Sequence, residues 1–242
     1  MNTYAKNATV VLVHGAWADG SSWGQMVEPL KETGLEVICA PIPLTSLSDD
    51  IAAVNRVVDR LEGPVLLAGH AYGGAPIAGV TSEKLKGLVY VAALAPAEGE
   101  TVADVFYREK PHPKAPQLAP DAYGFIWMPE TGFANAFAQH AKPETLAILS
   151  AVQRPINVKC IQEKAPVPAW KSKPSWFLVA EDDRMIAQKT QRFMAERMKA
   201  TIHSYPVDHT PFITAPGFVL ELLIEAANAT LGGSYPKGPR KL

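Results

Sequence analysis

Residues 65–74 read Val-Leu-Leu-Ala-Gly-His-Ala-Tyr-Gly-Gly, and this segment gives the strongest single indication of the fold. The apolar run at residues 65–68 is typical of a buried strand, and we expect a helix from the glycines to about Ser82. Glycine lacks a Cβ, so it lets the backbone turn sharply between a strand and a helix. On its own this spacing also fits a simple tight turn, so the rest of the chain has to decide.

Strand and helix patterns alternate on both sides of this turn. Apolar runs predict strands at residues 10–13, 35–39, 88–92, 175–180 and 201–207, and helical spacing predicts helices at residues 23–30, 47–61, 193–198 and 218–227. Such alternation predicts an α/β fold with a mainly parallel sheet and helices on both faces. Ligands of such sheets bind beyond the carboxyl ends of the strands, so the loops there are the place to look for chemistry.

One long segment interrupts the alternation. About residues 97–170 separate the fourth strand from the fifth, which is too long for a simple connection. Helical spacing at residues 133–137 and 145–152 indicates a short helical cap over the strand ends. We therefore expect a single domain over residues 1–242, with the cap as an insert.

The composition narrows the class of protein. The chain has 242 residues, 48% hydrophobic and 19% charged, with a formal net charge of −1. This balance is typical of a globular protein and gives no general attraction to nucleic acid or to anionic membranes. Cys39 and Cys160 do not suggest a disulfide framework. The first nine residues lack the apolar core of a signal peptide and no apolar run could span a bilayer, so we expect a cytoplasmic protein. We expect the tail from Gly232 to Leu242 to be mobile.

Three further patterns follow predicted strands. Residues 11–17 read Val-Leu-Val-His-Gly-Ala-Trp, residues 181–186 read Glu-Asp-Asp-Arg-Met-Ile, and residues 207–211 read Val-Asp-His-Thr-Pro. Thr210 and Pro211 are good N-cap and first-turn residues for the last helix, which places His209 at a strand end. His209 should therefore lie near the glycine-rich turn.

Together these patterns resemble the α/β-hydrolases, and most closely their small bacterial esterase-like members with a short helical cap. Segments that look like this group are residues 14–23, 69–74, 125–129, 153–155 and 191–197. The turn resembles the nucleophile elbow Gly-x-Ser-x-Gly, with Ala71 in place of serine. The resemblance implies Asp183 as the acid, with Asp182 as the competing choice, and His209 as the histidine. It implies the backbone N–H groups of Ala16 and Tyr72 as the oxyanion hole.

The remaining residues suggest the pocket and its ligand. We expect mainly apolar walls, with Trp17, Phe125, Trp127 and Met128 as substrate-binding residues; Tyr72, Phe133 and Phe137 are further candidates, although the two phenylalanines fit cap packing equally well. We interpret His14 and His70 as structural. The six histidines have no metal-ligand spacing, so we expect neither a metal nor a cofactor. The expected partner is a small neutral or apolar ester-like substrate, and the oligomeric state is left open, with a homodimer as one option.

Alanine at position 71 allows two explanations. We favour a deliberate Ser-to-Ala change in a carboxylic ester or lactone hydrolase, because the acid, histidine and oxyanion loop are all still present. Alternatively, Ala71 is natural and the protein does something else. It would then be a lyase or decarboxylase, similar to the plant methylketone synthases, or a ligand-binding protein.

Overall fold

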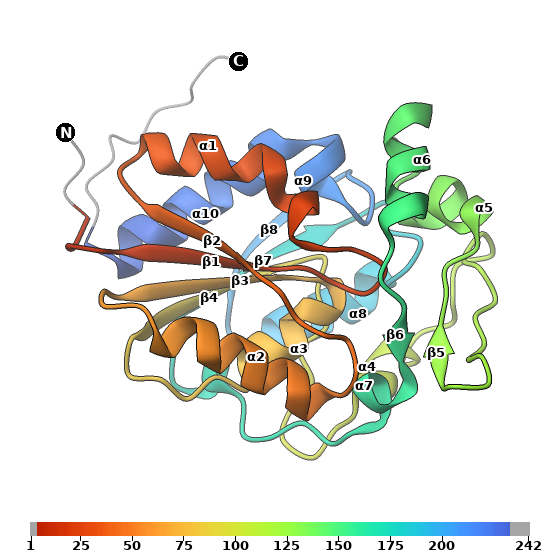
Figure 1. Cartoon of the computed structure of the whole chain (residues 1–242), viewed down its shortest axis with the longest axis horizontal. Helices are drawn as coiled ribbons and strands as arrows, with labels where there is room; N and C mark the ends of the chain where they lie inside the picture. Colours follow the sequence, from red (N-terminus) through yellow and green to blue (C-terminus); the bar gives the residue numbers. More distant parts are fainter. Residues whose placement is uncertain (1–3, 233–242) are drawn as a thin grey trace.

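A six-stranded sheet forms the centre of the molecule in the computed structural model, which describes residues 4–232 (Figure 1). The strands are β1 (Thr9–Val13), β2 (Glu36–Ala40), β3 (Val65–His70), β4 (Leu85–Val91), β7 (Ser175–Ala180) and β8 (Thr201–Tyr205). Their order is β2-β1-β3-β4-β7-β8, and every neighbouring pair is parallel. The predicted α/β class with a mainly parallel sheet is therefore confirmed.

Helices cover both faces of this sheet (Figure 1). One face carries α1 (Gly24–Glu32) and α10 (Pro216–Thr230), and the other carries α2 (Leu47–Asp59), α3 (Gly74–Ala78) and α8 (Gln188–Arg197). Side chains alternate along a strand, so β1 sends Val10 and Leu12 into the core under α1 and α10. Val11 and Val13 enter the core on the opposite face. Both faces are buried, which explains why the strands read as continuous apolar runs.

The helix after the glycine-rich turn is shorter than predicted. It begins as a 3₁₀ turn, η2 (Ala71–Gly73), continues as α3 and ends at Ala78 rather than at Ser82. Gly79 follows, and a Cβ there would lie 2.5 Å from the Ile51 side chain of α2. The close approach of α2 thus coincides with the end of α3.

The insert contains several short helices joined by loops, together with two short strands. Its elements are α4 (Val102–Phe106), β5 (Phe125–Ile126), α5 (Glu130–Gly132), the π-helical turn η3 (Phe133–Phe137), α6 (Pro143–Val152), β6 (Ile156–Asn157), α7 (Val158–Gln162) and the 3₁₀ turn η4 (Ala169–Lys171). Strands β5 and β6 pair antiparallel. The insert lies at the carboxyl ends of the central strands (Figure 1).

Short elements complete the fold beside the sheet. The 3₁₀ turn η1 (Gly20–Trp23) precedes α1, and α9 (Pro211–Thr214) precedes α10.

Cys39 and Cys160 are both free thiols. No helix within residues 4–232 is long and apolar enough to cross a membrane. Most of the tail predicted to be mobile, residues 233–242, lies outside the described residues.

Candidate active site

The turn between β3 and α3 holds Ala71 in an unusual backbone conformation. Its φ angle is +48°, in the left-handed region that residues with a Cβ rarely adopt. A Cβ on Gly69 would lie 2.5 Å from the Gly73 carbonyl oxygen, and one on Gly73 would lie 2.6 Å from the His14 carbonyl oxygen. Leu94 N–H donates to the Ala71 carbonyl at 2.9 Å. Such a conformation costs on the order of 1–3 kcal/mol and persists only where the surroundings impose it, as they do here.

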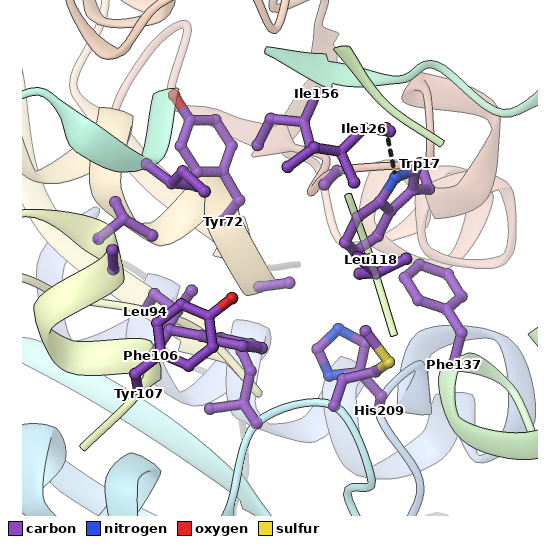
Figure 2. Close-up of a pocket in the computed structure, with 17 residues that line it drawn as sticks. Trp17, Tyr72, Leu94, Phe106, Tyr107, Leu118, Ile126, Phe137, Ile156 and His209 are labelled. Atoms are coloured by element: carbon purple, nitrogen blue, oxygen red, sulfur yellow. Dashed lines mark hydrogen bonds between the residues drawn. The ribbon is translucent and has the colours of Figure 1, made fainter. Parts of the chain in front are cut away.

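A buried acid–histidine pair lies beyond the ends of β7 and β8. His209 Nδ1 lies 2.8 Å from Asp183 Oδ2, and the two side chains are 2% and 0% exposed. A neutral imidazole carries its proton on the nitrogen that donates to the carboxylate. Nε2 is then the free proton acceptor. His209 lines the same cavity as Ala71, as Figure 2 shows for the imidazole ring.

Asp183 is held by three further groups besides His209. Its Oδ1 accepts from the N–H of Met185 at 2.7 Å and of Ile186 at 2.9 Å, and its Oδ2 accepts from Gln191 Nε2 at 2.8 Å. The competing acid, Asp182, is exposed. The structure therefore places Asp183, and not Asp182, against the histidine.

Gln191 contacts the acid directly, and the sequence patterns did not identify it. It lies fully buried on α8, where Nε2 also donates to the Ile186 carbonyl at 2.8 Å and Oε1 accepts from Ala180 N–H at 2.9 Å. A glutamine in a helix gives no sequence signal for this contact, because most glutamines on such helices face solvent.

The loop that carries His209 is fixed from two sides. His70 Nε2 donates to the His209 carbonyl at 2.8 Å, and Asp208 Oδ1 accepts from Thr210 N–H at 3.1 Å and from Thr214 Oγ1 at 2.6 Å. Burial, and secondarily the neighbouring His209, hold the pKa of His70 well below its usual value. His70 is therefore a neutral side chain that holds this loop.

The loop after β1 lies directly beside Ala71. His14 Nδ1 donates to the Gly15 carbonyl at 2.9 Å, and His14 Nε2 accepts from Ile42 N–H at 3.4 Å. Burial lowers the pKa of His14 to about 4, so it is neutral at pH 7 and shapes the loop. A Cβ on Gly15 would lie 3.0 Å from the Ala71 Cβ.

Two backbone N–H groups lie where the loop after β1 meets the turn at Ala71. Ala16 N–H has no hydrogen-bond acceptor among residues 4–232, and Tyr72 N–H belongs to the first turn of η2, where helical partners are lacking. The next residue, Trp17, has a φ of +58° and donates its own N–H to the Arg154 carbonyl at 3.0 Å. The structure thus brings Ala16 and Tyr72 to Ala71 but uses Trp17 N–H to hold the cap.

A cavity between the sheet and the cap joins these groups (Figure 2). It is lined by Ala16, Trp17, Ala71, Tyr72, Leu94, Val102, Ala103, Phe106, Tyr107, Leu118, Ile126, Phe137, Ile156, Ile161, Met185, Ile186 and His209. None of these lining residues is an acidic or basic side chain other than His209. The cavity therefore suits a neutral, largely apolar ligand.

Of the aromatic and cap residues that we predicted for the pocket, Trp17, Tyr72 and Phe137 line the cavity. Phe125, Trp127 and Met128 do not, which corrects that part of the prediction. Side chains alternate along an extended segment, so Ile126 faces the cavity while its neighbours point elsewhere. Trp127 is 53% exposed and donates to Asp121 Oδ2 at 3.3 Å.

Met128 and Phe133 pack within the cap. Met128 is 2% exposed and lies against Gly132, and Phe133 is fully buried with its ring 5.3 Å from that of Phe137. Phe137 extends this packing to His209, whose ring centre is 5.2 Å away. Phe133 thus belongs to the core of the cap, whereas Phe137 also forms part of the cavity wall.

One wall of the cavity, formed by α4, was missing from the sequence analysis. Thr101 and Asp104 form a capping box at its start, and Val102, Ala103, Phe106 and Tyr107 line the cavity. The Thr-x-x-Asp spacing could have predicted this short helix. Apolar side chains in a loop-rich insert give no signal for which of them will face a ligand.

Comparisons with known proteins agree with this architecture. A family model described as "Alpha/beta hydrolase family" matches residues 10–222. The chain is 23% identical to a pyrethroid hydrolase of Sphingobium wenxiniae over 91% of this chain and 88% of that one. It is 24% identical to Methylesterase 2 of Arabidopsis thaliana over 90% of this chain and 95% of that one.

Solved structures show the same fold at low sequence identity. A crystal structure of a serine-to-alanine variant of a pyrethroid hydrolase superposes with a TM-score of 0.79 at 20% identity, covering 92% of this chain and 98% of that one. A crystal structure of polyneuridine aldehyde esterase gives a TM-score of 0.74 at 16% identity, covering 91% and 99%. The parallel sheet, the turn at Ala71 and the match over residues 10–222 together place this chain in the α/β-hydrolase family.

Proposed function

We propose that this protein is a carboxylic ester or lactone hydrolase of the Ser-His-Asp type, present here in a form whose catalytic serine is replaced by Ala71. The observation that carries the proposal is the 2.8 Å contact between Asp183 Oδ2 and His209 Nδ1, because His209 lines the same cavity as Ala71. This contact supports the proposal, because a serine at position 71 would share the cavity with a histidine that is oriented by a carboxylate.

The chemistry of the serine form follows from these positions. His209 Nε2 takes the proton of the serine hydroxyl as its oxygen attacks the ester carbonyl carbon, and Asp183 stabilises the resulting imidazolium. The carbonyl oxygen becomes negative and accepts from the N–H groups of Ala16 and Tyr72. The C–O bond breaks, the alcohol leaves with the proton from His209, and water then hydrolyses the acyl-enzyme. No cofactor takes part.

The cavity indicates the class of substrate. Its walls are apolar and lack a charged partner for an anionic or cationic substrate, so the expected substrate is a small neutral ester. Among the relatives are proteins named pyrethroid hydrolase and methylesterase, which supports an ester with an apolar acyl or alcohol part.

A lyase or decarboxylase is the second candidate, favoured by one observation. The acid–histidine pair is complete although residue 71 is alanine. His209 could therefore transfer a proton next to a carbonyl without any covalent step. That function would need no hydroxyl at position 71.

The deciding experiment restores the hydroxyl. Ala71→Ser, Ala71→Gly and the unchanged protein are assayed at equal concentration against short-chain aryl esters and lactones, and against β-keto acids for decarboxylation. Removing the nucleophile of a serine hydrolase costs on the order of 10⁶ in kcat, so we expect Ala71→Ser to gain several orders of magnitude on at least one ester. Ala71→Gly changes the same position without adding a nucleophile, so it should gain nothing.

Each alternative result points to a different function. If Ala71→Ser folds but hydrolyses no ester faster than the unchanged protein, the hydrolase proposal is wrong. Turnover of a β-keto acid by the unchanged protein would then support the lyase, and tight ligand binding without turnover would support a binding protein. A serine codon at position 71 of the source gene would support a deliberate replacement.

A further inference from the structure

Asp50 is a fully buried carboxylate that the proposed reaction does not use. It lies in the first turns of α2 and is 0% exposed. Its Oδ2 accepts from the Tyr72 hydroxyl at 2.6 Å and its Oδ1 accepts from Leu44 N–H at 2.8 Å. The Cys160 thiol, from α7 of the cap, lies 3.6 Å from the same Oδ2. Burying a carboxylate costs free energy unless hydrogen-bond donors such as these surround it. We therefore looked for a function of this arrangement.

Tyr72 links this carboxylate to the site. Its ring forms part of the cavity wall, while its hydroxyl points away from the other lining residues, towards α2 (Figure 2). Its backbone is the second residue of η2, directly after Ala71. Tyr72 is thus held at both ends, by the turn at its backbone and by Asp50 at its hydroxyl.

The phenol remains a donor under ordinary conditions. Burial, and then the neighbouring Asp50 carboxyl, raise the pKa of Tyr72 well above its usual value of 10. The Tyr72 hydroxyl therefore stays protonated. Because the residue is only 3% exposed, water cannot easily replace its hydrogen bond to Asp50.

Asp50 is itself fixed from the cap side. Asn157 N–H donates to the Leu44 carbonyl at 3.0 Å, and Ser48 N–H donates to Glu163 Oε2 at 2.9 Å. These bonds join β6 and the residue that follows α7 to residues 44 and 48, just before and at the start of α2, on the N-terminal side of Asp50. The carboxylate therefore has a defined position relative to both the turn and the cap.

We propose that Asp50 is a positioning residue, which acts through the Tyr72 hydroxyl to fix the direction of the Tyr72 backbone N–H beside residue 71. This inference rests on the proposed function, because it takes that N–H to be an oxyanion donor. Oxyanion donors act on charge that develops in the transition state, so a misdirected N–H lowers kcat more than it weakens binding of a neutral ester.

The kinetic test uses Ala71→Ser as the parent. Adding Asp50→Asn or Tyr72→Phe should lower kcat about 10- to 100-fold, because a misplacement on the order of 1 Å costs about 10²-fold. KM should change by less than about threefold for a neutral ester. The two changes remove one interaction, so combining them should lower kcat little further.

Asp49→Asn is the matched control for Asp50→Asn, because it removes a carboxylate from the neighbouring position. Asp49 lies in the same turn of α2, is exposed, and contacts Thr45 and Ser46 rather than Tyr72. It should leave kcat unchanged. Thermal unfolding of each variant gives the fraction of folded protein, and kcat is calculated per folded molecule. Equal kcat in all variants would overturn the inference.

A second measurement needs no hydrolysis. In the Ala71 protein, the ¹⁵N–¹H signal of the Tyr72 amide should shift or broaden in Asp50→Asn but not in Asp49→Asn. A Tyr72 amide identical in all of these proteins would overturn the inference even if Ala71→Ser proved inactive. If Asp50→Asn does not fold, Tyr72→Phe decides the kinetic test, because it removes only the hydroxyl. An inactive Ala71→Ser with a perturbed Tyr72 amide would instead reject the hydrolase and retain the positioning contact.

Discussion

Two buried carboxylates flank the turn at Ala71, and they are held in different ways. Asp183, after β7, accepts from two backbone N–H groups, the Gln191 amide and the His209 imidazole. Asp50, on α2, accepts from one backbone N–H and from the Tyr72 phenol, with the Cys160 thiol nearby. Asp183 thus orients a side chain of the proposed reaction directly, whereas Asp50 reaches the site only through Tyr72.

Burial has an electrostatic consequence at Asp50. Burial raises the pKa of Asp50 to about 6, and the hydrogen bonds from Tyr72 and Leu44 offset this only in part. Our proposals give these two buried acids different roles, although both lie close to the turn at Ala71. What distinguishes the two is the group that each holds, and the following experiments test that difference.

The largest effect is expected at Asp183. Adding Asp183→Asn to Ala71→Ser should lower kcat by about 10⁴, because an amide favours the wrong tautomer of His209 while leaving the geometry intact. Ester hydrolysis at neutral pH measures this effect. A loss no greater than that of Asp50→Asn would mean that the two carboxylates do not differ in role.

A smaller effect is expected from the amide that supports Asp183. Gln191→Leu leaves Ala180 N–H and the Ile186 carbonyl without partners, which costs about 1–3 kcal/mol for each group. We expect a lower free energy of unfolding and, in the Ala71→Ser parent, a kcat about tenfold lower because Asp183 loses one donor. Gln188→Leu, one turn earlier on α8, is the matched control. Equal losses at both positions would argue against a positioning role for Gln191.

The raised pKa of Asp50 predicts a dependence of stability on pH. Below about pH 4 the carboxyl is protonated in both states, and between about pH 4 and 6 the unfolded chain loses the proton while the folded protein keeps it. Raising the pH through this window therefore favours unfolding. Relative to Asp50→Asn, the protein should lose about 1–3 kcal/mol across the window and no more above it.

Urea unfolding of both proteins from pH 4 to 7 measures this difference. Asp49 supplies a control of opposite sign, because hydrogen bonds from Thr45 and Ser46 lower the pKa of its carboxyl. Its contribution should be gained rather than lost as the pH rises. Parallel pH curves for the protein and Asp50→Asn would contradict the prediction.

The smallest effect is expected at Asp182. Its side chain is exposed, and its carbonyl rather than its carboxylate accepts from Gln139 at 2.8 Å. Asp182→Asn in the Ala71→Ser parent should change kcat by less than about twofold, as surface substitutions usually do. A loss that approaches that of Asp183→Asn would reverse the assignment of the acid.

Several cap residues show where sequence patterns stopped being informative. Helical spacing predicted the segments that became η3 and α6, but it did not predict which side chains would face the cavity. Trp127 is large and aromatic, yet it lies in solvent, whereas Ile126 beside it lines the cavity. Residue type alone does not tell which side chain of this short segment faces the cavity, because that depends on how the cap packs against the rest of the domain.

By itself, the sequence determined the parallel sheet, the turn at Ala71, and the strand ends that carry Asp183 and His209. These features follow from local causes: apolar periodicity sets the strands, and glycines permit the sharp turn. The contacts of Gln191 and Asp50, and the cavity wall formed by α4, could be seen only in the folded structure. The Tyr72–Asp50 and Cys160–Asp50 contacts join residues 22 and 110 positions apart, so no local pattern encodes them. They form because the elements that carry them pack together, and a buried carboxylate is stable only where hydrogen-bond donors surround it.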